Sequence, residues 1–217
     1  MTDWLINTET EILLAINGAH SSYFDEFMWL VSKTIQWWIV YATILALIYR
    51  CGWRKGLVIL AGVAFVVIFS DQISSSLLKP FFQRLRPSHN PDIENLVHIV
   101  NDSRGGLYGF VSSHAANTFG VATFVALVFR HKGITPVIYF WPMLVSYSRI
   151  YLAKHYLGDI IGGAIVGVLV ACAVYLIITV KTKDLRVDTR LKYGKFMLVA
   201  IIANVLYISV MACFYVL

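Results

Sequence analysis

The chain has 217 residues, of which 59% are hydrophobic and only 14% carry a charge, and its formal net charge is +6. A soluble domain would carry about a quarter charged residues. The charges here lie between long apolar runs, which are typical of membrane-spanning helices. The composition therefore excludes a soluble domain and indicates a single membrane domain over residues 1–217. The positive charge does not predict nucleic-acid binding, because the basic residues fall in short loops rather than on one face.

Residues 1–32 are predicted to form helices that lie at the membrane interface. In residues 2–17, apolar side chains recur with helical spacing and acidic side chains such as Glu9 stand between them. This pattern is typical of an amphipathic interfacial helix. Residues 24–32 predict a second, shorter amphipathic helix. The N-terminal stretch lacks a basic region and a cleavage site, so no signal peptide is expected.

The remainder, residues 35–217, predicts an all-α bundle of six transmembrane helices. The six stretches are 35–49, 56–78, 115–129, 134–152, 160–180 and 196–217. Between the second and third lies a long connection, residues 79–114, with three prolines and the pair Gly105-Gly106. Loops of this length are usually functional or disordered. Its prolines and aromatic residues favour an ordered extracytoplasmic cap loop.

The loops after the first, third and fifth stretches hold most of the basic residues. Short loops rich in lysine and arginine face the cytoplasm. The long connection and the 149–159 segment are then expected to face outward, together with both termini. The basic residues of the three loops are Arg50, Arg54, Lys55, Arg130, Lys132, Lys181, Lys183, Arg186, Arg190, Lys192 and Lys195.

The segment 148–159 carries the residues with the clearest chemistry. His155 and Asp159 are four positions apart, so on a helix they share a face and the carboxylate can hydrogen-bond the imidazole. Such a pair fixes the tautomer of a nucleophilic or basic histidine. Arg149 adds a planar guanidinium suited to phosphate oxygens.

Two upstream clusters extend this constellation. Lys79 and Arg86 add two cations, and Ser112-Ser113-His114 stands just before a predicted helix. Free backbone N–H groups at such a helix start can hold a phosphate, and ordinary N-capping by a serine is equally compatible with the pattern.

The chemistry of these clusters favours phosphoryl transfer without a metal. Three cations suit a phosphate, and two histidines suit a nucleophile and a general acid. No Cys/His/Glu cluster has zinc-site spacing, and no carboxylate-rich magnesium site is present in the sequence pattern. No metal and no cofactor are therefore expected. Taken singly, Arg84 and Lys154 are predicted to be interfacial cations that extend towards water.

Lys79-x6-Arg86-Pro87, Ser112-Ser113-His114 and Ser148-Arg149-x5-His155-x3-Asp159 together resemble the three-part signature of the type 2 phosphatidic acid phosphatase superfamily. In that family the second motif usually reads Pro-Ser-Gly-His. This chain has Val111 in place of the proline and Ser113 in place of the glycine. The resemblance implies a membrane hydrolase that acts on lipid phosphates through a phosphohistidine.

The resemblance also implies a role for each residue. His155 would attack phosphorus, Asp159 would orient its ring, and His114 would protonate the leaving lipid oxygen. The phosphate oxygens would be bound by Lys79, Arg86, Ser112, Ser113 and Arg149.

The resemblance implies a multi-pass protein of the bacterial inner membrane with its active site facing the periplasm. The expected partners are the lipid bilayer and a lipid phosphate, with no nucleic acid and no obligate protein partner. A lipid A phosphate is favoured as substrate, and undecaprenyl pyrophosphate and phosphatidylglycerophosphate are alternatives. A vanadium haloperoxidase is disfavoured by the apolar stretches. A non-catalytic lipid-binding or transport protein is disfavoured because every charged and imidazole position of the signature is retained.

Overall fold

The computed structural model describes residues 2–182, 185, 187 and 192–216. Of the basic residues noted above, Lys183, Arg186 and Arg190 lie outside this part. The α-helices in chain order are α1 (Thr2–Gly18), α2 (Ser22–Ser32), α3 (Trp38–Tyr49), α4 (Trp53–Asp71), α5 (Lys79–Phe82), α6 (Ser113–Phe129), α7 (Ile134–Tyr151), α8 (Leu157–Thr182) and α9 (Lys192–Val216). Short 3-10 turns occupy Thr34–Trp37, Pro87–His89 and Val100–Asp102, and a π-helical segment occupies Gln72–Leu78.

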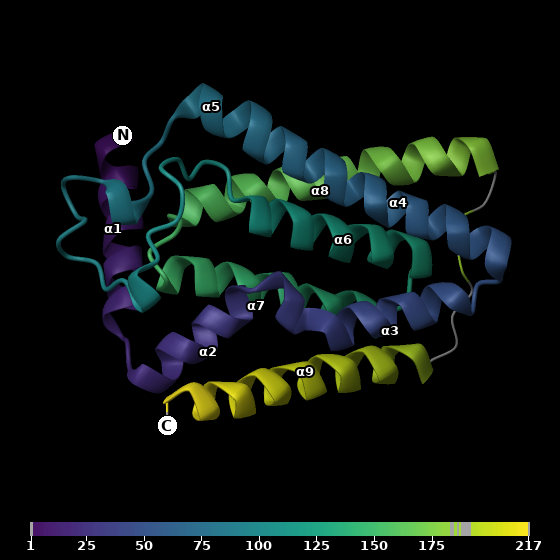
Figure 1. Cartoon of the computed structure of the whole chain (residues 1–217). Coiled ribbons are helices and arrows are strands. Elements are labelled where there is room, and N and C mark those ends of the chain that lie inside the picture. The colour runs from purple at the N-terminus through teal and green to yellow at the C-terminus, as the bar shows by residue number, and fades with distance from the viewer. Residues whose placement is uncertain (1, 183–184, 186, 188–191, 217) are drawn as a thin grey trace.

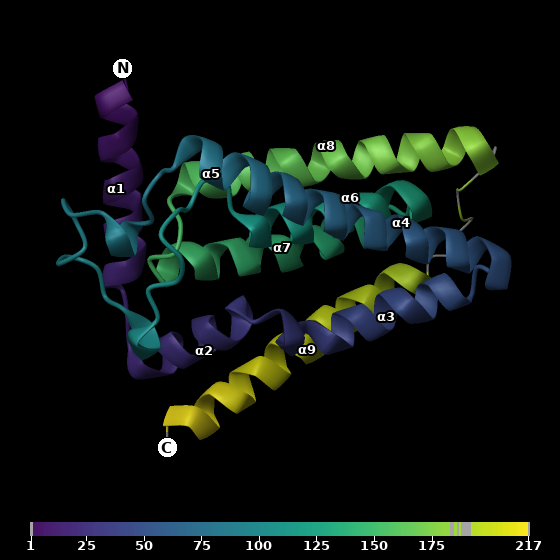
Figure 2. The same ribbon diagram turned by 45° about the horizontal axis from the view of Figure 1, so that its top comes forward.

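The long helices form a bundle with α6 at its centre. Helix α6 contacts α4, α7 and α8, while α9 contacts α2, α3 and α7. Figures 1 and 2 show that α1 lies across one end of this bundle, beside the long loop between α5 and α6. The α3–α4 turn lies at the opposite end. The bundle thus has one end that carries most of the irregular chain.

Three helical segments are long and apolar enough to cross a membrane: Trp53–Phe82, Leu157–Thr182 and Gly194–Val216. The pair Ser22–Ser32 and Thr34–Tyr49 would make a fourth, although the two helices are bent by 77° relative to each other. The exposed side of α8 carries apolar side chains such as Leu169 and Leu176, as a lipid-facing surface should. An all-helical membrane fold is confirmed among the described residues, and the count of six spans stays a prediction.

Helix α2 packs inside the bundle although its pattern predicted an interfacial helix. Its Met28, Leu30 and Val31 are buried, and it contacts α7 and α9. An amphipathic pattern shows that one face of a helix is covered, but it does not show whether protein or lipid covers that face. The interfacial location of residues 1–32 therefore remains a prediction.

Helices α6 and α8 approach each other closely because two glycines face the contact. A Cβ atom on Gly163 would lie 2.4 Å from the carbonyl oxygen of Ser112, and one on Gly167 would lie 2.1 Å from that of Ala116. Glycines at four-residue spacing are a common device for close helix packing in membranes. This contact brings the start of α6 next to the start of α8.

The predicted loop 79–114 begins later than the sequence indicated. The helix that starts at Trp53 continues through the π-helical segment as far as Phe82, and Gln83 ends it in the left-handed conformation (φ 48°). Two hydrogen bonds then join the ends of the loop, from Arg86 N–H to the Leu107 carbonyl (3.0 Å) and from Gly109 N–H to the Arg84 carbonyl (2.8 Å). The loop is therefore folded onto itself, and its role as a cap stays a prediction.

Candidate active site

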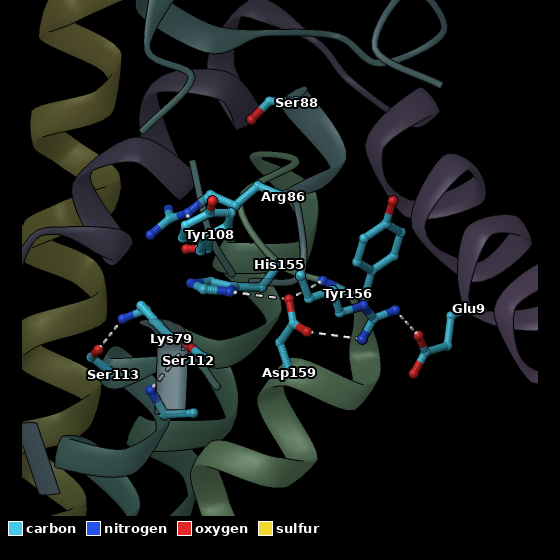
Figure 3. A network of polar contacts seen from close by, with 12 residues as sticks. Glu9, Lys79, Arg86, Ser88, Tyr108, Ser112, Ser113, His155, Tyr156 and Asp159 are labelled. Atoms are coloured by element: carbon cyan, nitrogen blue, oxygen red, sulfur yellow. Dashed lines mark hydrogen bonds and ion pairs between the residues drawn. The ribbon is translucent and has the colours of Figure 1, made fainter. Parts of the chain in front are cut away.

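His155 and Asp159 form the buried centre of the site, and their side chains are 1% and 0% exposed. Asp159 lies in the first turn of α8, whereas His155 lies in the connection before that helix. The expected pairing is present, with Nδ1 of His155 3.3 Å from Oδ2 of Asp159, but only Asp159 is helical. The same oxygen accepts the backbone N–H of Tyr156 at 3.1 Å, as an acidic residue in a capping box does. The backbone at the start of α8 therefore orients the Asp159 carboxylate, and this carboxylate in turn orients the His155 ring (Figure 3).

The second oxygen of Asp159 belongs to an ion-pair chain that the sequence did not reveal. Nη1 of Arg84 lies 2.9 Å from Oδ1 of Asp159, and Nη2 of Arg84 lies 2.5 Å from Oε2 of Glu9 on α1. The guanidinium also stacks over the ring of Tyr156, 4.4 Å from its centroid. The prediction that Arg84 is an interfacial cation that extends towards water was therefore wrong. Arg84 is an ion-pair partner of the buried Asp159 carboxylate.

Three cations surround the imidazole on its other side. Burial lowers the pKa of His155 well below its usual range, and the nearby positive charges of Arg149, Arg86 and Lys79 lower it further. A hydrogen bond with the Gly109 backbone acts in the opposite direction. The imidazole is therefore neutral at neutral pH and keeps a lone pair for attack.

Each of these cations is held by the fold. Nε of Arg86 donates to the carbonyl of Tyr108 at 3.1 Å. Nζ of Lys79 donates to the hydroxyl of Ser113, and Nη1 of Arg149 donates to the hydroxyl of Ser32. Arg149 is 8% exposed, and its Nε has no hydrogen-bond partner among the described residues. A phosphate oxygen would satisfy such a buried donor.

The start of α6 supplies the remaining predicted residues. Ser112 is the N-cap and accepts the Ala115 N–H at 3.4 Å, and its own N–H donates to the backbone carbonyl of Asp159 at 2.9 Å. Ser113 is the first helical residue, and its hydroxyl contacts Lys79 and lies 2.9 Å from that of Ser75. The start of α6 is thus capped by Ser112, and it also carries the partial positive charge of a helix N-terminus. Both interpretations of the Ser112-Ser113-His114 motif are compatible with this geometry.

Two glycines of the long loop are required by the site. A Cβ atom on Gly109 would lie 2.8 Å from Oδ2 of Asp159, and one on Gly105 would lie 2.7 Å from Nη1 of Arg86. Gly105 also has a φ of +78°, which side chains rarely adopt. In the sequence, Gly105-Gly106 indicated only a loop, and no pattern indicated that Gly109 lies against the site.

Lys154 was predicted as an interfacial cation but is 4% exposed. Its ammonium donates to the carbonyl and hydroxyl of Ser103 and lies 5.9 Å from the ring centroid of Trp29. Burial lowers the pKa of Lys154 to about 8, and the positive charges of Arg149 and Arg86 contribute. The lysine therefore adds positive charge to the site from inside the fold.

Two cavities meet at His114. A polar chamber of about 330 Å³ is lined by Arg149, Lys154, Ser103 and His114. An apolar groove of about 500 Å³ runs between α3, α4 and α6 and ends at Ser113 and His114. Its polar end also carries Asp71 and Asn117. His114 thus lies where a charged group in the chamber would join an apolar group in the groove.

The structure gathers all eight predicted site residues at this end of the bundle. Burial and the positive charges of Arg149, Arg86 and Lys79 also lower the pKa of His114, to about 3. These charge effects and the hydrogen bonds described above link Lys79, Arg86, Ser112, Ser113, His114, Arg149, His155 and Asp159. The sequence missed Arg84 and Glu9 because their partner lies far along the chain. The run Arg84-Leu85-Arg86 is the one local signal that could have drawn attention to Arg84.

A family model matches the part of the chain that carries these eight residues. The model of the PAP2 superfamily matches residues 56–183, which is more than half of the chain. The chain belongs to the PAP2 superfamily. The resemblance seen in the three motifs is thereby confirmed, and the residues outside the PAP2 match include Glu9 and all of α1 and α2.

Two curated relatives are similar over most of their length, and a third is similar over about half. The chain is 40% identical over 192 residues to "Lipid A 4'-phosphatase" of Bacteroides thetaiotaomicron, covering 87% of this chain and 85% of that protein. It is 39% identical over 174 residues to the "Lipid A 4'-phosphatase" of Porphyromonas gingivalis, covering 80% and 74%. It is 28% identical over 118 residues to "Phosphatidylglycerophosphatase B" of Bacillus subtilis, covering 50% and 53%.

Solved structures share the PAP2 fold. Aquifex aeolicus LpxE superposes with a TM-score of 0.57 at 22% identity, covering 76% of this chain and 93% of that one. A PAP2-type phosphatidylglycerolphosphate phosphatase from Bacillus subtilis gives a TM-score of 0.59 at 22% identity, covering 82% and 86%. At this identity the likeness concerns the fold alone.

Proposed function

We propose that this PAP2 protein removes a phosphate from lipid A at the periplasmic face of the bacterial inner membrane, through a phosphohistidine on His155. That it is a membrane lipid phosphatase follows from its superfamily and its relatives. The choice of lipid A is supported by the two lipid A phosphatases, which align over most of their length. The phosphatidylglycerophosphatase aligns over half and is less identical, which makes its substrate the weaker candidate.

In the first step, the phosphate would lie among Lys79, Arg86 and Arg149. Nδ1 of His155 faces Asp159, so Nε2 is the nitrogen free to attack phosphorus. The new N–P bond forms as the bond from phosphorus to the lipid oxygen breaks. Asp159 stabilises the positive charge that develops on the ring, and the three cations stabilise the charge on the phosphate oxygens.

The leaving lipid oxygen requires a proton, and we assign its donation to His114. Burial and the nearby positive charges of Arg149, Arg86 and Lys79 lower the pKa of His114 to about 3 in the free site, so the negative charge of the bound phosphate has to favour the protonated ring before it can donate. In the second step, water attacks the phosphohistidine, His114 takes back a proton from that water, and inorganic phosphate leaves. The sum is one water consumed, with one phosphate and one lipid alcohol formed. His155 returns to its neutral state.

The position of His114 on the walls of both cavities carries this proposal. A phosphate bound at Arg149, between the polar chamber and the buried His155, and an acyl chain in the apolar groove would place their connecting oxygen beside the His114 imidazole. A groove of about 500 Å³ is within the usual range for ligand sites, roughly 300–1,000 Å³. A soluble phosphate ester would leave the groove unused, whereas a lipid uses both cavities.

The outward orientation is supported by where the basic loops lie. Arg50 and Arg54 follow α3, at the bundle end opposite α1 and the long loop, and His155 lies at the α1 end. The positive-inside rule assigns that basic end to the cytoplasm. In a background without Cys51, Cys172 and Cys213, a membrane-impermeant thiol reagent should label Gly106→Cys in intact cells, because a Cβ there meets nothing within 4 Å. Lys132→Cys should react only after permeabilisation.

The substrate is tested with purified full-length protein in detergent and three lipids presented in parallel. These are lipid A with both phosphates, phosphatidylglycerophosphate and undecaprenyl pyrophosphate, with product detected by mass spectrometry. We expect the highest kcat/KM for lipid A and no turnover of any of them by His155→Ala. A higher kcat/KM for either of the other two lipids would overturn the choice of lipid A.

A further inference from the structure

Three side chains from separate segments meet on the outside of the α1–α2 turn. His20 lies in that turn, Asp25 in the first turn of α2, and His98 in the long loop. One donor atom of each lies within 4.8 Å of the others. Nε2 of His98 is 2.8 Å from Oδ2 of Asp25, and the rings of His20 and His98 stack with centroids 3.8 Å apart and planes at 9°.

The positions of these side chains are set by a buried polar framework. The Asn17 side chain, 1% exposed, accepts the His98 N–H at 2.7 Å and donates to the His98 carbonyl at 2.9 Å. It also donates to the Tyr151 carbonyl at 2.7 Å. The hydroxyl of Tyr151 in turn donates to Oδ1 of Asp25 at 2.8 Å. Hydrogen bonds from Asn17 and Tyr151 therefore hold His98 and Asp25 in place, whereas His20 is exposed.

We propose that His20, Asp25 and His98 bind a Zn²⁺ ion, with water as a fourth ligand. Two imidazole nitrogens and one carboxylate oxygen are a ligand set that zinc accepts, at bonds of about 2.0–2.2 Å. Ligating carboxylates and histidines are usually fixed by outer hydrogen bonds. Tyr151 supplies such a bond to the unused oxygen of Asp25, and Asn17 fixes the backbone of His98.

The ion would replace the hydrogen bond between His98 and Asp25, and the His20 ring would have to leave its stack on His98 to direct a nitrogen lone pair at the same point. A tetrahedral zinc with such bonds places its donor atoms roughly 3.3 Å apart, closer than the present limit of 4.8 Å. The exposed ring of His20 can rotate towards the Asp25–His98 pair to close this gap. Sequence spacing could not show the site, because His20 and His98 are far apart in the chain and the local pattern around each is ordinary.

The proposed role is structural, since none of the three ligands belongs to the catalytic constellation. Zinc would join the α1–α2 turn, α2 and the long loop. That loop carries Gly105 and Gly109, which lie against Arg86 and Asp159. Metal binding would thus stabilise the loop against the site without taking part in phosphoryl transfer.

The test uses the chelator-treated full-length protein in detergent, titrated with ZnCl₂ by calorimetry. We expect one Zn²⁺ per chain and a melting temperature raised by roughly 5–10 °C when zinc exceeds its Kd about a hundredfold. His20→Ala should lose at least tenfold in zinc affinity without unfolding, because its side chain is exposed. Asp25→Asn should also weaken binding, since it removes the charge and keeps the size.

Two controls assign the binding to this cluster. His89→Ala, in the same loop, should bind zinc like the unmodified chain, and so should His155→Ala, which removes an imidazole of the catalytic centre. Co²⁺ in place of zinc should give intense visible bands typical of four ligands, and these should be absent in His20→Ala. Absence of zinc binding, or equal zinc affinity in His20→Ala and the unmodified chain, would overturn the proposal.

Discussion

Arg84 donates to the oxygen of Asp159 that faces away from His155, over a distance of 2.9 Å. The carboxylate therefore lies between an imidazole and a guanidinium, and the guanidinium of Arg84 does not belong to the lining of the polar chamber. The same guanidinium extends to Glu9 on α1. Arg84 is thus a positioning residue for Asp159 and, through it, for the nucleophile.

Arg84→Gln is expected to lower kcat with little change in KM. A hydrogen bond between charged groups contributes about 1.5–3 kcal/mol, which corresponds to roughly a ten- to hundredfold loss of rate. KM should hold because Arg84 does not contact the phosphate-binding cations. Arg104→Gln is the matched control, since Arg104 pairs with Glu94 at 3.5 Å on the surface. A rise in KM with unchanged kcat in Arg84→Gln would show a substrate-binding role instead.

The two histidines should respond differently to the leaving group. His155→Ala should abolish turnover of every substrate, because it removes the nucleophile. His114→Ala should lose on the order of 10²–10⁴-fold on a lipid monoester, as for a general acid. On p-nitrophenyl phosphate it should lose much less, since that leaving group departs without a proton. Steady-state kinetics on both substrates measure this, and equal losses of His114→Ala on both would contradict its role as acid.

The acid side of the pH–rate profile should lie below pH 6.5. Burial and the positive charges of Arg149, Arg86 and Lys79 hold the pKa of His155 well below its usual range, so the ring stays neutral where an ordinary histidine is half protonated. Arg86→Gln removes one positive charge, which favours the protonated ring and raises this pKa. The acid limb of kcat/KM should therefore move to higher pH in Arg86→Gln with the same substrate. An unmoved limb would mean that another group sets it.

The same shift affects stability, and its sign is fixed by proton binding. Below pH 6.5 the unfolded chain protonates this histidine while the folded chain does not, so unfolding takes up a proton. The contribution of His155 to stability is full above pH 6.5 and declines as the pH falls towards the folded pKa. Thermal melts of the unmodified chain and His155→Gln should diverge in that range, with a weaker pH dependence in the variant.

Ser113 separates the role of a hydroxyl from that of a backbone N–H. As the first residue of α6 it tolerates proline, which is favoured at this position, and Ser112 before it already has an extended ψ of 115°. Ser113→Pro should lose about a hundredfold or more in kcat if the N–H binds the phosphate. Ser113→Ala keeps the N–H and loses the contact with Lys79, so a smaller loss is expected. The reverse order of the two losses would assign the function to the hydroxyl.

Filling the apolar groove should harm lipid substrates selectively. Val67 on α4 lines the groove and is 36% exposed, so Val67→Trp can be accommodated. Displacing two methylenes of an acyl chain at about 0.8 kcal/mol each gives roughly a tenfold higher KM for a lipid. The KM for p-nitrophenyl phosphate should not change. Leu57→Trp on the same helix lies outside the groove lining and is the control.

The motifs predicted which residues lie together because each motif is local. His155 and Asp159 lie four residues apart, and Ser112 to His114 are consecutive, so short spacing carried their association. The predicted pairing of His155 with Asp159 is present although His155 precedes α8, because the Asp159 carboxylate in the first turn of α8 extends back to the His155 ring. The apolar runs likewise predicted a helical membrane fold.

Long-range contacts escaped the sequence for a physical reason. The Arg84–Asp159 pair joins residues far apart in the chain, and an arginine beside a membrane helix has the same local pattern whether it pairs or extends into water. The 77° bend between α2 and α3 is equally invisible, because hydrophobicity does not record direction. The continuation of this helix from Leu78 to Phe82 was missed because Pro80 is tolerated in a helix where the π-helical segment has already changed the hydrogen-bond pattern.

The ion pair between Glu9 and Arg84 has a consequence for any shortened form of the protein. Residues 56–183, matched by the family, contain all three motifs, yet they exclude Glu9 on α1. A chain trimmed to those boundaries would keep every residue to which we assign nucleophilic attack, proton transfer or phosphate binding. Its Arg84 would lose one of two carboxylate partners and be less firmly oriented towards Asp159. We therefore expect a chain that retains all three motifs but lacks the N-terminal helix to be less active than the full chain.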